Sequence, residues 1–473
     1  MIHKKLLYPV FCSLSLLVAC SSDDPQPVEQ TIDWQPCVYD QDLQCATLAV
    51  PIDYDAVDSE TLMLSINRLQ SSSADTTESL FFNPGGPGGS GTELIRVFKE
   101  ASNIPDAIRA RYHLVGFDPR GIGESRPVDC RAEGIDDLDD YLVDESAISA
   151  YVDQSQAAFD ACLAKYGDYL KQLGSMNVVR DMEEMRKAMA QPDLHFIGYS
   201  YGTRLAALYL QMFPETSGRI VLDASISPDS SANLLAEGGL VAMQTNLENM
   251  LSQCSISEPE CTGEILLTSL LTRINTLLQN EDEQTFEILG ALLVAGVQEP
   301  EFADFLIAPL TQYLLNDDRD ALFEFAQLAQ EVFEDDAEDS LTAQYAVICE
   351  DDPQRLSLGE LTSNLARYNN LSDLFAEASI SITASCTSWP ASTNPLPIIT
   401  TRSAPQSLVI GGTSDAQTPV AWSEDMAASI GGVFIRSAHE GHTSVFNEKS
   451  ACIDEMVSSF LLDGELPSTA ECP

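Results

Sequence analysis

The sequence is organised around the pentapeptide at residues 198–202, Gly-Tyr-Ser-Tyr-Gly. An apolar run, Leu194 to Ile197, precedes it, and a helical pattern from Thr203 to Met212 follows it. The order of strand, Gly-x-Ser-x-Gly and helix places the serine on a turn so sharp that small residues are needed on both sides. Ser200 is therefore a candidate nucleophile, with its hydroxyl pushed out of the turn.

The first residues have the layout of an export signal. Two lysines precede an apolar run from Leu6 to Ala19, which is too short to span a membrane, and Cys20 follows it. Residues 17–20, Leu-Val-Ala-Cys, resemble the lipobox of bacterial lipoproteins, and a plain signal peptide cut elsewhere is the alternative. We expect residues 1–19 to be removed and residues 20–32 to form a polar tether. We also expect the protein to be exported and lipid-anchored to a bacterial membrane, with the outer membrane or periplasm favoured, or secreted.

The cysteines indicate disulfide bonds. Loss of Cys12 with the signal and a lipid on Cys20 leave 10 of the 12 cysteines, an even number in an exported chain. Sequence alone does not choose among the connectivities, and the simplest scheme pairs sequence neighbours: Cys37 with Cys45, Cys130 with Cys162, Cys254 with Cys261, Cys349 with Cys386, and Cys452 with Cys472. The spacings lack the C-x-x-C pairs or nearby histidines of a zinc site, so we expect neither a metal nor another cofactor.

The charge balance excludes some partners. The chain has 24 Lys and Arg against 73 Asp and Glu, a formal net charge of −49. This charge argues against nucleic acid and against an anionic membrane face as partners, and it favours cationic ligands. An acidic surface is also an ordinary route to solubility, so it says little about the substrate. We expect a monomer.

A glycine-rich loop provides candidate oxyanion donors. The short apolar strand Leu80 to Phe82 breaks into residues 83–91, Asn-Pro-Gly-Gly-Pro-Gly-Gly-Ser-Gly. Glycines let backbone N–H groups approach a ligand without side-chain obstruction. In α/β-hydrolases, an N–H of such a loop joins the N–H of the residue after the nucleophile to hold the oxyanion. We predict these two donors to be the backbone amides of Gly86 and Tyr201, with Gly85 as the alternative to Gly86.

A serine nucleophile needs an imidazole base and a carboxylate that orients the base. The order Ser200, Asp415, His442 matches the chain order of α/β-hydrolase triads. His439 is the alternative base, and Asp223, which ends an earlier strand, is the alternative acid. The other three histidines lie in the signal or at the starts of strands. The sequence therefore predicts a catalytic triad and leaves these two alternatives open.

Strand and helix patterns alternate up to about residue 224, which indicates a mostly parallel sheet. The pattern is then helical over residues 225–400, and the sheet resumes after that. We predict an α/β-hydrolase core formed by residues 33–224 and 401–473, with a helical cap inserted after the sixth strand. Within the core, Arg120 follows the fourth strand, where it can pair with a carboxylate below the site.

Five segments together resemble the tripeptidyl aminopeptidase branch of the proline iminopeptidase-like serine peptidases, within the α/β-hydrolase superfamily. They are Asn83 to Gly91, Asp118 to Ser125, Gly198 to Thr203, Gly412 to Pro419 and Gly441-His442. The resemblance extends from about Trp34 to Cys472. It implies a serine aminopeptidase that releases tripeptides, other short peptides or single residues from free N-termini through an acyl-enzyme.

The resemblance also implies a binding site for the substrate amine. Residues 346–351, Ala-Val-Ile-Cys-Glu-Asp, are similar to a segment of the cap that holds the free amino terminus in that branch. This transfers the role to Asp351, with Glu350 beside it, although in so acidic a chain such a run is also typical of a solvated turn. A carboxylic ester hydrolase with the same triad, and a non-catalytic binding lipoprotein with an inert hydrolase fold, are the other hypotheses.

Overall fold

The structure is a computed structural model that describes residues 32–134, 142–229, 231–256, 260–279, 282–333, 341–372, 374–400 and 407–473. The predicted signal peptide, Cys20 and all but the last residue of the predicted tether lie outside these ranges. Within them, no helix is long and apolar enough to cross a membrane.

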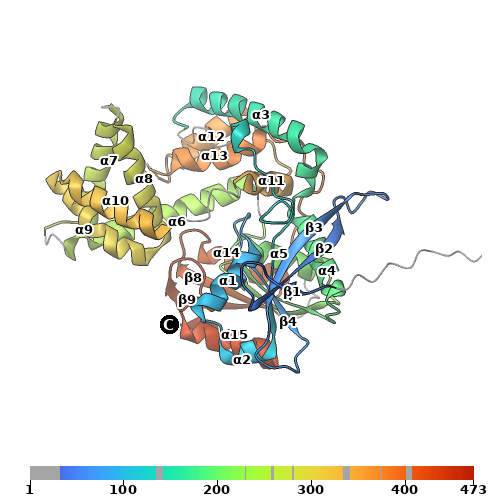
Figure 1. Ribbon diagram of the computed structural model, residues 1–473. Helices are drawn as coiled ribbons and strands as arrows, with labels where there is room; N and C mark the ends of the chain where they lie inside the picture. Colours follow the sequence, from blue (N-terminus) through green and yellow to red (C-terminus); the bar gives the residue numbers. More distant parts are fainter. Residues whose placement is uncertain are drawn as a thin grey trace, which may run out of the picture.

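All ten strands belong to one sheet, in the order β1-β2-β3-β5-β4-β6-β7-β8-β9-β10, which lies in the lower part of the view in Figure 1. Every pair from β5 through β10 is parallel, and the pairs from β1 to β5 are antiparallel. The strands are β1 Gln35–Pro36, β2 Leu43–Pro51, β3 Thr61–Leu69, β4 Ser79–Asn83, β5 His113–Phe117, β6 Leu194–Tyr199, β7 Ser217–Asp223, β8 Leu408–Ser414, β9 Val433–Glu440 and β10 Glu471–Cys472. The predicted α/β-hydrolase fold with a mostly parallel sheet is confirmed.

Helices cover both faces of the sheet, which explains why its central strands are apolar throughout. All five residues of β4 are buried, and neighbours on it point to opposite faces. Phe81 packs in the cluster that contains the side chains of α4, α5 and α14, and Phe82 packs with those of α1, α2 and α15. These helices are α1 Gly91–Ala101, α2 Asp106–Arg111, α4 Ser175–Ala188, α5 Gly202–Met212, α14 Val420–Ile430 and α15 Ala451–Asp463.

Eight helices lie between β7 and β8 in the described sequence: α6 Ala232–Ser252, α7 Gly263–Gln279, α8 Glu283–Gln298, α9 Pro300–Asn316, α10 Arg319–Phe333, α11 Leu341–Asp351, α12 Leu358–Tyr368 and α13 Ala376–Thr387. Most of them share a hydrophobic core of their own, separate from the two cores of the sheet. Helix α11 differs, because its Ala346 and Val347 pack in the sheet's cluster with α4 and α5. Helix α11 therefore connects the inserted helices to the helices that cover the sheet.

Helix α3, Glu145–Tyr166, also packs on the inserted helices, although it precedes the elbow in the chain (Figure 1). Its Tyr151 lies in the core shared with those helices, and the Tyr151 hydroxyl is 2.5 Å from the Ser385 hydroxyl of α13. No pattern in the sequence indicates this contact.

The structure contains the five disulfides of the simplest pairing scheme: Cys37–Cys45, Cys130–Cys162, Cys254–Cys261, Cys349–Cys386 and Cys452–Cys472. The expected disulfides are therefore present, and they follow the simplest of the pairings that the sequence left open. The Cys349–Cys386 bond joins the end of α11 to α13, and the Cys452–Cys472 bond joins α15 to the last strand.

Arg120 pairs with Asp181 of α4 through two hydrogen bonds, of 2.8 Å from Nε and 2.6 Å from Nη2. Both side chains are fully buried, and backbone carbonyls accept the remaining Arg120 hydrogens. A bidentate pair of this kind fixes orientation as well as distance. Arg120 thus connects the loop after β5 to helix α4.

Candidate active site

Ser200 occupies the turn between β6 and α5 in a left-handed backbone conformation, with φ of 53°. Such a conformation is costly for a residue other than glycine and persists where the surroundings hold it. The Ser200 N–H donates to the Asp223 carbonyl at 3.0 Å. A Cβ on Gly198 would lie 2.2 Å from the Gly202 carbonyl oxygen, so the turn excludes a larger residue there. The structure therefore gives Ser200 the geometry of a nucleophile elbow.

The glycine-rich loop after β4 lies directly against this turn. A Cβ on Gly85 would lie 2.9 Å from the Ser200 Cβ and 3.1 Å from the Tyr201 nitrogen. Gly85 also has φ of 101°, a conformation that side-chain-bearing residues rarely adopt. Its own N–H is engaged, because it donates to Asn83 Oδ1 at 3.1 Å. The loop is thus in place beside the Tyr201 amide, and the engaged Gly85 amide favours Gly86 as the second donor.

The loop is fixed at its far end by Asp118. The Asp118 carboxylate accepts hydrogen bonds from the hydroxyls of Ser90, at 2.6 Å, and Thr92, at 2.9 Å. It also accepts from the Glu124 amide at 3.1 Å. This buried carboxylate therefore connects the glycine-rich loop to the loop after β5 and helps to hold the glycine-rich loop in place.

Asp415 and His442 meet at hydrogen-bond distance. Asp415 Oδ2 is 2.8 Å from His442 Nδ1, and the Thr418 amide and hydroxyl also donate to the Asp415 carboxylate, at 2.8 Å and 2.7 Å. Burial alone would raise the pKa of Asp415, but the hydrogen bond and charge of His442, with the Thr418 bonds, hold it below its ordinary value. Asp415 is therefore ionised and can orient the His442 ring through Nδ1.

The alternative base, His439, lies elsewhere. Its ring packs on Gly412, where an added Cβ would be 2.7 Å from His439 Nε2, and neither ring nitrogen has a hydrogen-bond partner in the described part of the chain. Burial lowers the His439 pKa to about 4. Asp415 is hydrogen-bonded to His442 and not to His439, so the structure favours His442 as the base.

The alternative acid, Asp223, supports the loop that follows His442. Its Oδ2 accepts hydrogen bonds from the amides of Ser444 and Val445, both at 2.7 Å. Its carbonyl oxygen accepts from the Ser200 amide. Asp223 thus links the nucleophile turn to the histidine loop, a role that the sequence did not reveal, because an acid at the end of this strand is equally typical of a triad member.

Asp223 gives rise to a pH-dependent stability. Burial raises the pKa of Asp223 to about 6 from an ordinary 3.8, so between these values the folded protein holds this proton more tightly than the unfolded chain does. Through this group alone, the free energy of unfolding falls by up to about 3 kcal/mol as pH rises from about 4 to about 6. We expect Asp223→Asn to remove this fall.

The measurement is urea denaturation of the wild type and the Asp223→Asn variant between pH 4 and pH 7. The difference in unfolding free energy between the two proteins isolates Asp223, because the other titrating groups are common to both. A difference that stays constant over this range would contradict the assignment.

Asp351 and Glu350, the predicted amine-binding residues, are buried at the end of α11. The Glu350 carboxylate accepts hydrogen bonds from Trp389 Nε1 at 3.0 Å and from the Thr393 amide at 3.1 Å. The Asp351 carboxylate accepts from the amide and hydroxyl of Ser175 and pairs with Arg204. Both oxygens of each carboxylate are therefore engaged within the protein. Amine binding by these residues stays a prediction, and the prediction of a solvated turn is wrong.

A cavity of about 420 Å³ lies beside Asp351, between the end of α11, the loop after β7 and the segment before β8. Asp229 and Asp352 are among its lining residues, with Ile398 and Ile399 on the apolar side.

The described residues include no group of three His, Cys, Asp or Glu side chains that could hold a metal ion.

Known proteins are similar to this chain over most of its length. Residues 372–472 match the family model described as TAP-like protein. The chain is 26% identical to serine protease Hip1 of Mycobacterium tuberculosis, with 94% of this chain and 91% of the relative covered. It is 25% identical to the tripeptidyl aminopeptidase of Streptomyces lividans, with 92% and 84% covered. It is 28% identical to carboxylesterase B of Mycobacterium tuberculosis, with 90% and 85% covered.

Among solved structures, proline iminopeptidase from Mycobacterium smegmatis aligns with a TM-score of 0.35 at 14% identity, over 88% of this chain and 93% of that one. The sequence relatives confirm the predicted resemblance to the tripeptidyl aminopeptidases. Together with the α/β-hydrolase fold and the residues assembled at the elbow, they identify a serine hydrolase.

Proposed function

From its similarity to tripeptidyl aminopeptidases over nearly its whole length, we propose that this serine hydrolase is an aminopeptidase. It releases tripeptides, other short peptides or single residues from free N-termini through an acyl-enzyme. The observation that carries the hydrolase chemistry is the 2.8 Å contact between Asp415 and His442, on loops at the same sheet edge as the Ser200 turn.

In the proposed mechanism, His442 Nε2 takes the proton of the Ser200 hydroxyl as its oxygen attacks the scissile carbonyl carbon. The amides of Gly86 and Tyr201 hold the oxyanion of the tetrahedral intermediate. His442 then gives the proton to the leaving amine, the C–N bond breaks, and Ser200 carries the acyl group. Water, deprotonated by His442, hydrolyses this ester and restores the hydroxyl.

A second function is carboxylic ester hydrolysis by the same triad. The 28% identity to a relative named carboxylesterase B supports it, because the triad chemistry does not itself select the acyl or leaving group. The relatives named for peptide cleavage are similar over a slightly larger share of the chain, 94% and 92% against 90%.

Three matched substrates distinguish the two functions: a tripeptide anilide with a free amine, the same anilide with a blocked amine, and a short nitrophenyl ester. We expect kcat/KM for the free-amine anilide to exceed that for the blocked anilide by about 100-fold, the penalty for losing one charge-assisted contact in a buried site. Turnover of the ester alone would support the esterase and contradict the aminopeptidase.

We further propose that the protein is exported and anchored by a lipid on Cys20, with residues 20–32 as the tether. The basis is the order of lysines, apolar run and lipobox-like Leu-Val-Ala-Cys at the start of the sequence. The five disulfides of the folded domain are consistent with an oxidising compartment.

A further inference from the structure

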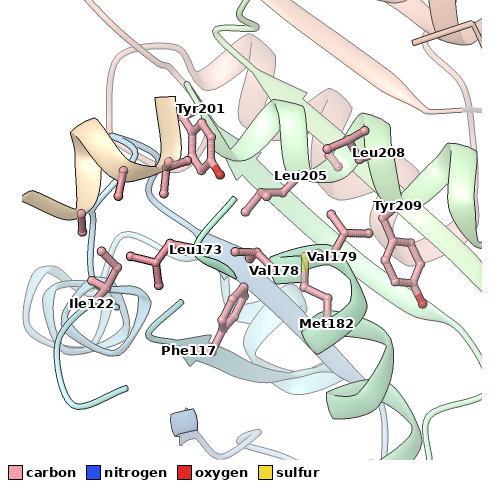
Figure 2. Packing of buried hydrophobic residues seen from close by; sticks show 14 of the residues in the cluster. Phe117, Ile122, Leu173, Val178, Val179, Met182, Tyr201, Leu205, Leu208 and Tyr209 are labelled. Carbon is pink, nitrogen blue, oxygen red and sulfur yellow. The ribbon is translucent and has the colours of Figure 1, made fainter. Parts of the chain in front are cut away.

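The side chain of Tyr201, the residue after the nucleophile, is held by a chain of buried hydrogen bonds. The Tyr201 hydroxyl is 2.6 Å from Ser175 Oγ, and Ser175 Oγ is 2.5 Å from Asp351 Oδ2. Burial raises the pKa of Asp351, but the charge of Arg204 and the hydrogen bonds from Ser175 oppose that rise and favour the carboxylate, which only accepts. The Ser175 hydroxyl therefore donates to Asp351 and accepts from Tyr201. Figure 2 shows the Tyr201 ring at the top of the hydrophobic cluster, with its hydroxyl directed away from the backbone.

Asp351 is suited to this position by two further contacts. Its Oδ1 accepts the Ser175 amide at 2.8 Å, at the first turn of α4, where a helix favours negative charge. Its Oδ2 lies 3.2 Å from Arg204 Nη1, and the two side chains are only 1% and 3% exposed. The other nitrogens of Arg204, Nε and Nη2, have no hydrogen-bond partner among the described residues. Asp351 therefore neutralises the Arg204 guanidinium, which has no other hydrogen-bond partner for Nε and Nη2 among the described residues.

Arg204 also reaches Tyr201 directly. The guanidinium carbon lies 5.9 Å from the centre of the Tyr201 ring, within the range of a cation–π contact. The ring is thus fixed at its hydroxyl by Ser175 and on its face by Arg204, and both of these residues are held by Asp351.

Asp351 is itself rigidly placed. The neighbouring Cys349 is bonded to Cys386, and Glu350 binds Trp389 and Thr393. Helix α11 belongs to the same hydrophobic cluster as Tyr201 and α5. The support for Tyr201 therefore comes from α11, one of the inserted helices, and not from the elbow alone.

We infer that Asp351, Ser175 and Arg204 are positioning residues that hold the Tyr201 ring, and through it aim the Tyr201 amide at the oxyanion. Ser200 precedes Tyr201 in a strained conformation, which needs such support from its surroundings. The inference rests on the proposed acyl-enzyme function but not on the choice between peptide and ester. It gives Asp351 a role in the chemical step, in place of a contact with the substrate amine.

Two tyrosines, Tyr201 at the start of α5 and Tyr209 within it, provide the test. Both phenols are buried and hydrogen-bonded: the Tyr201 hydroxyl reaches Asp351 through Ser175, and the Tyr209 hydroxyl donates directly to Glu183 at 2.7 Å. Only Tyr201 belongs to the elbow, and Figure 2 shows its ring well apart from the Tyr209 ring. We expect Tyr201→Phe to lower kcat about tenfold on both the free-amine anilide and the nitrophenyl ester, and to leave KM within about twofold. This loss in kcat is smaller than the loss caused by deletion of an oxyanion donor, because the Tyr201 amide remains in place. We expect Tyr209→Phe to leave both constants within about twofold.

The affinity for a peptide aldehyde is a measurement that a loss of stability alone would not change. The aldehyde forms a hemiacetal with Ser200 whose oxygen occupies the oxyanion site, so its affinity should fall about tenfold in Tyr201→Phe and Ser175→Ala. Affinity for the cleaved tripeptide, which forms no oxyanion, should stay within about twofold. Ser175→Ala keeps the Asp351–Arg204 pair, so it serves if Tyr201→Phe does not fold.

Asp351→Asn separates the two roles of Asp351. We expect it to lower kcat to a similar extent on substrates with and without a free amine. A rise in KM confined to free-amine substrates, with unchanged kcat in Tyr201→Phe and Ser175→Ala, would overturn the inference and restore the amine-binding role. Absence of activity and of Ser200 labelling in the wild type would instead overturn the proposed function.

Discussion

Ser200→Ala is expected to lower kcat by about a million-fold, the loss that follows removal of the nucleophile from a serine triad. Alanine keeps the Cβ that fits the turn at φ 53°, and the Ser200 amide can still donate to the Asp223 carbonyl. The free energy of unfolding should therefore change by less than about 1 kcal/mol. The measurement is turnover of the free-amine anilide and the nitrophenyl ester, with denaturation curves for both proteins.

Ser357→Ala is the matched control. Ser357 caps α12 by a reciprocal capping box with Glu360, so its loss should cost about 1 kcal/mol of stability without a change in kcat. Retention of more than a few per cent of activity in Ser200→Ala would show that another residue is the nucleophile.

Asp415→Asn is expected to lower kcat by about 10,000-fold, because an amide in place of the carboxylate favours the wrong tautomer of His442 and cannot stabilise its charged form. The comparison is Asp223→Asn, which alters the other buried acid of the site. An asparagine carbonyl can take the place of Asp223 Oδ2 and accept the same two backbone amides, so kcat should stay within about tenfold.

Steady-state kinetics of the two variants at neutral pH decides between the two acids. The account predicts a difference of about three orders of magnitude between them, in favour of Asp223→Asn. A larger loss in Asp223→Asn than in Asp415→Asn would make Asp223 the triad acid and contradict the geometry at His442.

The core of the site was predictable because its signals are local. The small residues around Ser200, the glycines from Gly85 to Gly91 and the loops that carry Asp415 and His442 each follow an apolar strand. Parallel strands bring their carboxyl ends to one edge of a sheet, so the order along the chain is enough to place these groups together. The presence of disulfides was predictable from the even number of cysteines, and every bond joins cysteines that are neighbours in the sequence, although the sequence did not decide among the pairings.

The parts that sequence reasoning missed depend on contacts between distant segments. Asp351 meets Arg204 across 147 positions, and in a chain with 73 acids nothing local distinguishes it from a solvated carboxylate. Asp223 is a candidate acid until the structure shows its oxygens bound to the amides of Ser444 and Val445. Helix α3 lies within residues 33–224, which the sequence assigns to the core, and only its packing on α12 and α13 associates it with the inserted helices.

Covalent labelling with a fluorophosphonate tests most directly whether Ser200 is an activated nucleophile. The reagent forms a bond between its phosphorus and the serine oxygen with loss of fluoride, and it requires the base that deprotonates the serine. The account predicts one adduct in the wild type, mapped by peptide mass spectrometry to Ser200, with labelling slowed at least about 100-fold in His442→Ala. No adduct on the folded protein, or an adduct on a different serine, would contradict it and would favour an inert hydrolase fold or another catalytic centre.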